Sequence, residues 1–240
     1  MSYIGTNKVD KMYLGGTAIG KAYLGDDLVY DSSGGGITPV LPYDAEIEFL
    51  QSSGTQYINT SISPSTSFEC EIKAEFTQNQ AGFDTLLGSY TSTSEYGVAL
   101  AIRATYEANA GYIQFGANGS GTSLIVSSIQ TLGLHTYKTS LKNSTLKVDV
   151  DGTVNSRTWG TGQSPSSLPM YMFARNKGGG TIGNYSKAKV YYCKIWNGGN
   201  LVFDAIPVRV GSTGYMYDRV SGQLFGNLGS GSFTLGNDKS

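Results

Sequence analysis

Apolar and polar residues alternate along much of the chain. In the segment 68–76, apolar side chains occupy every even position from Phe68 to Phe76, and Glu or Lys occupies every odd position. Successive side chains of a strand point to opposite faces, so this period of two predicts a strand with one buried face and one wet face. Similar segments predict further strands at 46–50, 55–60, 84–89, 96–103, 111–116, 123–130, 134–141, 145–150, 153–158, 170–174, 187–196, 201–206, 214–218 and 223–226.

Turn sequences between these segments support an all-β fold. Asp151-Gly152 separates 145–150 from 153–158, and the sequence Asn-Gly-Gly-Asn at 197–200 separates two further segments. Both are typical of tight β-hairpin turns. The one segment with helical potential, 103–110, is too short to form a stable helix by itself. Many short strands at regular spacing predict a β-sandwich or a barrel.

Three near-copies of a ten-residue unit open the chain. Their shared register places Tyr at 3, 13 and 23, Gly at 5, 15 and 25, and a β-branched residue at 9, 19 and 29. Because Gly tolerates positive φ where a chain reverses, each copy is predicted to form a strand, a tight turn and a strand. An element this small cannot bury a core of its own. We therefore expect it to dock on the rest of the chain, on sister copies or on a larger assembly.

A glycine- and proline-rich segment divides the chain. Residues 33–43 read SGGGITPVLPY, a composition typical of a linker. We expect an N-terminal repeat element at 1–33, a linker at 34–43 and a β-sandwich domain at 44–240.

Composition narrows the classes of partner. The 240 residues include 33 Gly and 17 Tyr, only 15% are charged, and the net charge is −1. Binding to a phosphate backbone needs clustered Lys and Arg, so we expect no nucleic-acid partner. No apolar run approaches a membrane-spanning length, and the start lacks an apolar signal core. We therefore expect the protein to be made in a cytoplasm and not to insert into a membrane.

The two cysteines, Cys70 and Cys193, lie far apart inside strand-like segments. Synthesis in a cytoplasm favours two buried, reduced thiols. A single bridge between neighbouring strands is the alternative.

Four segments carry a resemblance to a known group of domains. They are GTQYINT (54–60), LKVDVDGT (146–153), the segment 172–208 with FARNKGGG and KVYYCKIWNGG, and the segment 214–236 with GQLFGN and GSFTLG. Together they resemble the laminin-G-like, concanavalin-A-like jelly-roll domains of tail fibres and other appendages of bacteriophages and prophages of gut bacteria. The resemblance covers about residues 44–236. It implies an all-β fold, a jelly-roll β-sandwich preceded by a small β-repeat element.

The opening decapeptides are separately similar to the YLG-type N-terminal repeats of such phage proteins. This resemblance implies a virion protein of the tail-fibre or head-fibre type, made in the host bacterial cytoplasm and assembled as a homotrimer through exposed strand edges. Its implied partners are other virion proteins and polysaccharide on the host surface. The attachment candidates are Tyr3, Tyr13, Tyr23, Lys11 and Lys21.

The sequence offers little catalytic chemistry. His135 is the only histidine, and neither a G-x-S-x-G nor an H-E-x-x-H sequence occurs. Concanavalin-like folds also include glycoside hydrolases, which place two carboxyl groups across a cleft. Three carboxylate pairs at spacing two share a strand face, but each lies opposite an apolar row and is interpreted as a solvated face: Glu46/Glu48, Glu69/Glu71 and Asp149/Asp151. We therefore expect no catalytic residues and no enzyme.

Sugar binding requires exposed aromatic rings beside amides or arginines. Trp159 lies in a loop rich in Gly and Thr, Arg175 and Asn176 begin a glycine-rich loop, and Tyr185 follows it. We take these four residues as glycan-binding candidates. Trp196, at the end of an alternating segment, is interpreted as a packing residue.

We expect no cofactor and no metal. The alternative is Ca²⁺ bound by Asp149, Asp151 and Asn155, because oxygen ligands gathered near a turn suit that ion. An ordinary Asp-Gly hairpin is the simpler interpretation.

The leading hypothesis is a structural appendage protein of a bacteriophage whose jelly roll contacts host glycan. The alternative is a carbohydrate-binding module without a virion role. A glycoside hydrolase ranks below both.

Overall fold

The computed structural model describes residues 2–4, 7–9, 13–14, 17–24, 27–31, 41–78, 82–90, 99–104, 111–116, 123–126, 132–158 and 165–239. All regular structure in these residues is β-strand, and none of it is helix. Accordingly, the search of these ranges for an apolar helix long enough to cross a bilayer finds none. The chain divides into two compact units, Met1–Tyr43 and Asp44–Ser240.

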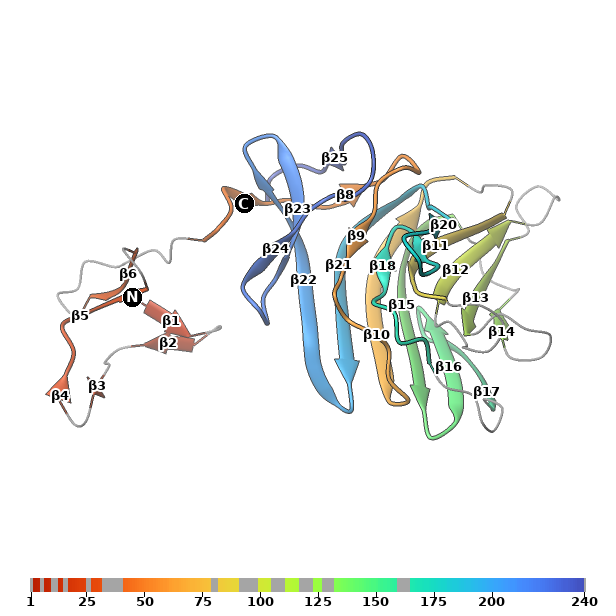
Figure 1. The fold of residues 1–240 in the computed structure, drawn as a ribbon, viewed down its shortest axis with the longest axis horizontal. Helices are drawn as coiled ribbons and strands as arrows, with labels where there is room; N and C mark the ends of the chain where they lie inside the picture. The colour runs from red at the N-terminus through yellow and green to blue at the C-terminus, as the bar shows by residue number, and fades with distance from the viewer. Residues whose placement is uncertain are drawn as a thin grey trace. The chain divides into compact units, whose positions relative to one another are not determined.

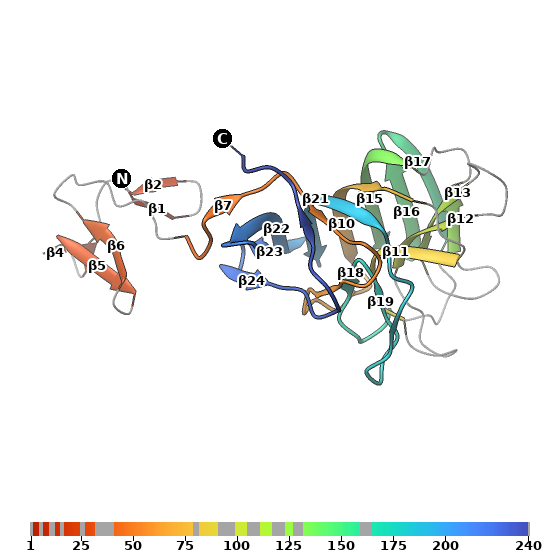
Figure 2. The ribbon, with the colours of Figure 1, turned by 90° about the horizontal axis from the view of Figure 1, so that it is seen from above.

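Each opening decapeptide forms its own two-stranded hairpin. The pairs are β1 (Ser2–Ile4) with β2 (Asn7–Val9), β3 (Tyr13–Leu14) with β4 (Thr17–Ala18), and β5 (Lys21–Leu24) with β6 (Asp27–Asp31). Figures 1 and 2 show the first and third of these hairpins from two directions. Tyr pairs with the residue five positions later in all three, at 3, 13 and 23. The two residues between the strands begin with Gly in every copy, a sequence typical of type II′ turns.

The second unit contains a large antiparallel sheet. Its main strands follow the order β17-β16-β15-β10-β21-β22-β23-β24, and Figure 1 shows the central ones side by side. Their bounds are β10 Phe68–Phe76, β15 Gly133–Lys142, β16 Thr145–Val150, β17 Thr153–Thr158, β21 Ala188–Asn197, β22 Asn200–Val210, β23 Thr213–Asp218 and β24 Gln223–Phe225. Three short strands extend it: β7 (Ala45–Glu46) pairs with β22, β8 (Leu50–Gln51) pairs with β21, and β25 (Thr234–Leu235) pairs with β8.

A second sheet completes the sandwich. Its order is β14-β13-β12-β11-β18-β9, all antiparallel. The bounds are β9 Ile58–Asn59, β11 Gly82–Gly88, β12 Ala99–Ala104, β13 Gly111–Gly116, β14 Ser123–Val126 and β18 Tyr171–Met172. A small hairpin of β19 (Arg175–Asn176) and β20 (Ile182–Gly183) stands beside it. The all-β jelly-roll sandwich predicted from the sequence is confirmed.

The core lies between the two sheets. On β10, the apolar residues from Phe68 to Phe76 are all buried, and the charged residues between them are half-buried. Leu86, Met172 and Ile58 of the smaller sheet belong to the same apolar cluster. Burying one such side chain contributes about 1.5 to 3 kcal/mol, so this cluster is the main source of stability.

Two predicted hairpin turns are present. Asp151 and Gly152 join β16 to β17 with φ of 50° and 90°, and Gly198 and Gly199 join β21 to β22 with φ of 59° and 82°. Positive φ at both central residues is the type I′ geometry, which matches the twist of the flanking strands. In the segment with helical potential, positions 103 and 104 belong to β12, and 105–110 lie outside the described residues.

A β-bulge in β21 changes which residues face outward. Lys73 of β10 pairs with Tyr192 and Ala74 pairs with Val190, so Tyr191 is the extra residue. Both tyrosines are therefore half-buried on the outer side, whereas Val190 and Cys193 on either side are buried. A bulge of this kind commonly redirects side chains near functional surfaces.

The two cysteines are free thiols buried on neighbouring strands. Cys70 lies on β10 and Cys193 on β21, and no disulfide joins them. A hydrogen bond with Cys70 and burial together raise the pKa of the Cys193 thiol well above its ordinary value. Both residues pack as small apolar side chains.

Candidate functional site

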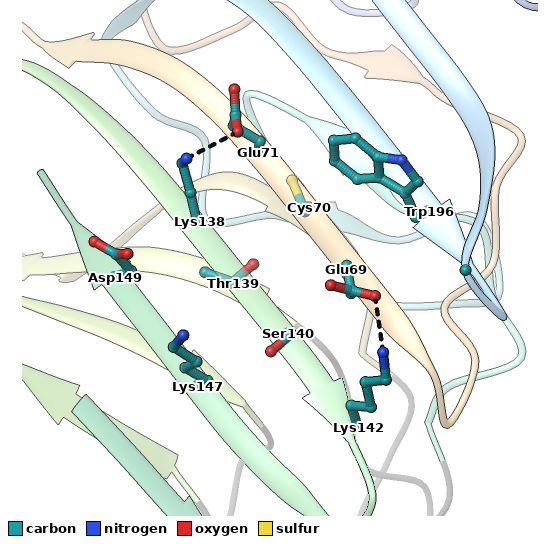
Figure 3. A pocket seen from close by; sticks show the side chains of 11 residues that line it. Glu69, Cys70, Glu71, Lys138, Thr139, Ser140, Lys142, Lys147, Asp149 and Trp196 are labelled. Carbon is teal, nitrogen blue, oxygen red and sulfur yellow. Dashed lines mark ion pairs between the residues drawn. The ribbon is translucent and has the colours of Figure 1, made fainter. Parts of the chain in front are cut away.

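A groove of about 530 Å³ crosses the outer face of the large sheet, and we call it the outer groove. Its lining comes from four adjacent strands, β21, β10, β15 and β16, and from Gly199 in the turn after β21. Figure 3 shows Trp196 of β21 at one side, Glu69 and Glu71 in the middle, and Lys147 and Asp149 of β16 at the other.

One row of side chains runs across these strands from an aromatic ring to a cation. Trp196 and Ser140 both pair with Glu69 across strand boundaries, and Lys147 pairs with Ser140 on the next strand. Three strand spacings separate the ends of this row, which corresponds to about 14 Å. Among the described residues, Lys147 has no ion-pair partner. The row thus offers a ring, a carboxylate, a hydroxyl and an ammonium group along one line.

A second row alternates in charge. It runs through Lys194, Glu71, Lys138 and Asp149, each from a different strand. Lys138 forms an ion pair with Glu71 at 3.3 Å, and Lys142 lies 3.7 Å from Glu69 in the first row. Pairs this exposed contribute about 0 to 1 kcal/mol each, so they set side-chain positions more than stability.

Trp196 presents a ring to the groove. Its side chain is half-buried, and within the described part of the chain neither its ring nor its indole N–H has a partner. We interpreted it from the sequence as a packing residue, but the alternation of β21 sends Cys193 and Ile195 inward and Trp196 outward. An indole in this position can stack on an apolar ligand face and donate one hydrogen bond.

Tyr191 and Tyr192, at the bulge, hold two outer-face carboxylates in place, and one of these, Glu71, lines the groove. Tyr192 Oη donates to Glu71 Oε1 at 2.8 Å, and Tyr191 Oη donates to Glu75 Oε2 at 3.3 Å. Burial and then the bond to Glu71 raise the pKa of Tyr192 to about 12. Tyr192 therefore remains a hydrogen-bond donor at neutral pH and keeps Glu71 oriented.

The glycan-binding candidates from the sequence lie in different settings. Trp159 lies outside the described residues. The Asn176 amide is buried in a structural role, because its nitrogen donates to Pro169 O at 2.9 Å and its oxygen accepts from Gly178 N at 3.0 Å. Asn176 is thus not available as a binding group.

Arg175 and Tyr185 have different surroundings. Burial lowers the pKa of Arg175 to about 10, and the neighbouring Tyr90 opposes this shift. Tyr185 is half-buried, and its ring packs edge-to-face against Tyr57 with centroids 6.3 Å apart. Of the four candidates, Tyr185 is the one that the structure describes within an accessible aromatic group.

The candidate calcium ligands lie on β16, on β17 and in the turn between them. Asp149 Oδ1 accepts from Gly152 N at 2.8 Å. Asp151 lies in the turn, not on the strand face of Asp149, and its carboxylate accepts from Thr136 N at 2.9 Å and contacts His135 Nδ1 at 2.6 Å. Asn155 lies on β17 opposite Val148. The described ranges contain no group of three His, Cys, Asp or Glu side chains suited to a metal.

The attachment candidates occupy equivalent places in the hairpins. Tyr3, Tyr13 and Tyr23 lie on β1, β3 and β5 at the same pairing position. Lys21 begins β5 and is exposed, whereas Lys11 lies outside the described residues.

The outer groove is not among the sites predicted from the sequence, although the sequence contains a signal for it. The alternation along β10 shows that the side chains at positions 69, 71 and 73 point outward. The same alternation along β21 shows that Trp196 points outward. The missing information was the register between β10 and β21, which are more than 100 residues apart in the chain.

No family model matches the sequence, and no curated protein sequence is similar to it. A solved structure of a proposed carbohydrate-binding protein from Bacteroides ovatus is similar with a TM-score of 0.57 at 12% identity, over 81% of this chain and 61% of that one. This chain therefore spans less than two thirds of the length of that protein. The likeness supports the fold.

Two further structures have weaker likeness. The CBM40 of the Ruminococcus gnavus IT-sialidase, bound to α2,3-sialyllactose, gives a TM-score of 0.48 at 11% identity, over 65% of this chain and 91% of that one. The enzymatically active domain of tailspike protein 2 from bacteriophage CBA120 gives 0.40 at 11% identity, over 62% and 25%.

Proposed function

We propose that this protein binds carbohydrate through the outer groove and does not cleave it. The observation that carries the proposal is the half-buried, partnerless Trp196 ring at the end of a row of polar groups on a hollowed sheet face. The fold shared with a Bacteroides ovatus protein that is itself proposed to bind carbohydrate supports the same direction.

The chemistry of the first row matches the two sides of a pyranose. The apolar face of a sugar ring stacks on an indole, and its hydroxyls both donate and accept hydrogen bonds. Glu69 accepts, Ser140 does both, and Lys147 donates. With a row of about 14 Å, more than one sugar unit can contact these groups together.

The groove carboxylates favour binding without hydrolysis. A glycosidase needs one protonated carboxyl group as an acid, and an apolar setting is what normally keeps it protonated. Glu69 and Glu71 instead lie on the wet face beside Lys142 and Lys138. We propose on this ground that the protein is not an enzyme.

A glycan array with the full chain and Trp196→Ala tests the site. Loss of one stacking ring should weaken binding about tenfold, and Trp196→Phe should restore part of it. The matched control is Tyr215→Ala, a half-buried aromatic residue on β23 of the same sheet but outside the groove lining. Unchanged binding by Trp196→Ala, or no binding by the wild type, would contradict the groove proposal. Sugar release from a bound polysaccharide would contradict the non-enzymatic role.

A second proposal concerns the setting of the protein. We propose that the three hairpins attach it to a bacteriophage virion as a tail-fibre or head-fibre-type appendage, closed as a homotrimer. The supporting observation is that all three copies pair in the same register, each as a two-stranded sheet in the described residues. Isolated two-stranded hairpins are marginally stable, so partners that pair with their edges would stabilise them.

Deletion of residues 1–33 tests the attachment role. The shortened protein should keep the melting temperature of the jelly roll but no longer join particles when it replaces the full chain during assembly. A solution mass of three chains for the full protein and one for the shortened protein is expected. Normal incorporation of the shortened protein would refute this second proposal.

A further inference from the structure

Three tyrosines from separate segments meet on the smaller sheet, and we call them the tyrosine platform. Tyr57 stacks on Tyr171 with ring centroids 4.9 Å apart and planes 25° from parallel. Tyr185 packs edge-to-face against Tyr57 at 6.3 Å. All three are half-buried, so the group is a surface feature and not part of the core.

The platform faces away from the core of the sandwich. Met172 and Ile58 pair with each other across β18 and β9 and are fully buried. Because neighbouring residues on a strand point to opposite faces, Tyr171 points outward beside Asn59. Tyr57, directly before Ile58, follows the same alternation. The platform thus lies on the outer face of the smaller sheet, and the outer groove lies on the outer face of the large one.

Hydrogen-bonding groups on the platform are unused. Within the described residues, none of the three phenol hydroxyls has a partner. Asn59 accepts from Ser61 N through its amide oxygen at 2.9 Å, and its amide nitrogen has no partner in the same ranges. Burial and then the neighbouring Tyr57 raise the pKa of Tyr171 and of Tyr185, so both remain donors at neutral pH.

The two residues that hydrogen-bond to the backbone of Tyr57 are uncharged. Leu228 is 59% exposed and its N–H donates to Tyr57 O at 2.9 Å. Asn227 Oδ1 accepts from Tyr57 N at 3.2 Å. By contrast, the outer groove is lined by three lysines and three carboxylates.

We propose that the tyrosine platform is a second carbohydrate-binding site, for the apolar face of a neutral pyranose. The Tyr57 and Tyr171 rings supply the stacking surface, and the hydroxyls with the Asn59 amide bind sugar hydroxyls. The site is independent of the outer groove, so the jelly roll contacts glycan from both outer faces. Two sites on one rigid unit strengthen attachment to a surface that carries a ligand for each of them.

Affinity electrophoresis of the full chain tests the proposal, with gels that contain dextran, galactomannan, xyloglucan or mixed-linkage β-glucan. At least one of these neutral polymers should retard the wild type. The double variant Tyr57→Ala/Tyr171→Ala should bind that polymer about tenfold more weakly. Trp196→Ala should be retarded as strongly as the wild type, which separates the platform from the groove.

A conservative pair of substitutions covers the case in which loss of the rings disturbs folding. Tyr57→Phe/Tyr171→Phe keeps the stacked rings and removes the hydroxyls, and it should bind about threefold more weakly at an unchanged melting temperature. The proposal is overturned if none of the four polymers retards the wild type. It is equally overturned if the phenylalanine variant binds as the wild type does, or if Trp196→Ala alone abolishes retardation.

Discussion

Each strand of the large sheet contributes side chains to an inner and an outer face, and the nine residues of β10 show how different these faces are. Its inner side chains, from Phe68 to Phe76, are buried against the second sheet, while its outer side chains are charged and half-buried. The same alternation produces both faces, but burial restricts the inner positions alone to apolar side chains. The inner face therefore determines stability, and the outer face is free to carry recognition chemistry.

The largest effect should come from the inner face. Phe68 is 1% exposed, and Phe68→Ala should lower the free energy of unfolding by about 3 to 5 kcal/mol because it leaves a cavity in the apolar cluster. The matched control is the next residue, Glu69→Ala, which should cost less than about 1 kcal/mol. Urea denaturation of both variants measures the difference. Equal losses would break the contrast between the two faces.

Asp218 sharpens the comparison because it is a carboxylate in an inner position of β23. It is 2% exposed, and it accepts hydrogen bonds from Asp204 N, Val220 N, Ser221 N and Ser221 Oγ. Asp218→Ala would strand these donors and should cost about 2 to 4 kcal/mol in the same assay. Asp218→Asn keeps one acceptor oxygen and should cost roughly half as much. An alanine variant as stable as the wild type would show that these donors do not need the Asp218 carboxylate as their acceptor.

The bulge at Tyr191 permits a direct test of the alternation of inward and outward residues along β21. Deletion of Tyr191 leaves Val190, Tyr192 and Cys193 in simple alternation, so both flanking residues still face inward. We expect a folded protein that is less stable by about 1 to 2 kcal/mol, because the contacts of Tyr191 with Glu75 and Phe49 are lost. Thermal unfolding measures the change. Collapse of the fold on deletion would mean that the bulge is required for the sheet and is not an addition to its outer face.

The smallest effect concerns Asp151 on the exposed turn. Burial alone would raise the pKa of its carboxyl, but the hydrogen bonds from Thr136 N and His135, with the charge of His135, hold it below the ordinary value. Because the pKa is lower in the folded state, Asp151 stabilises the fold at pH values above the unfolded pKa of about 3.9. This contribution to the free energy of unfolding is lost as the pH falls through the folded pKa.

Asp151→Asn should therefore cost about 0.5 to 1 kcal/mol at pH 7, since the side chain is 51% exposed. Denaturant unfolding from pH 7 down to pH 2 should show that the free energies of unfolding of the wild type and the variant converge at the acid end. A difference that persists at pH 2 would mean that packing, and not the charge of Asp151, causes the effect.

Local chemistry explains which parts of the fold could be predicted. The strand 68–76 and the turns at Asp151-Gly152 and 197–200 depend on near neighbours in sequence, and all were predicted. The bulge is also visible in the sequence pattern, because the spacing of the inward residues of β21 changes from two to three between Val190 and Cys193.

The candidate site depended on contacts between distant segments. The outer groove required the register of β10 with both β15 and β21, and the burial of Asn176 required the position of Pro169 and the closed hairpin after it. The sequence predicts Tyr185 as a rim residue after the glycine-rich loop, whereas its ring neighbour Tyr57 comes from a segment more than 100 residues away. Propensity carries no information about such distances.

Because every decapeptide closes on itself, the opening region is built from interchangeable pieces. An in-frame duplication or loss of thirty nucleotides would add or remove one complete hairpin and break no strand pair of its neighbours. Repeat number can therefore drift between lineages without any compensating change in the sandwich, and selection could adjust this region by counting units instead of by redesigning them.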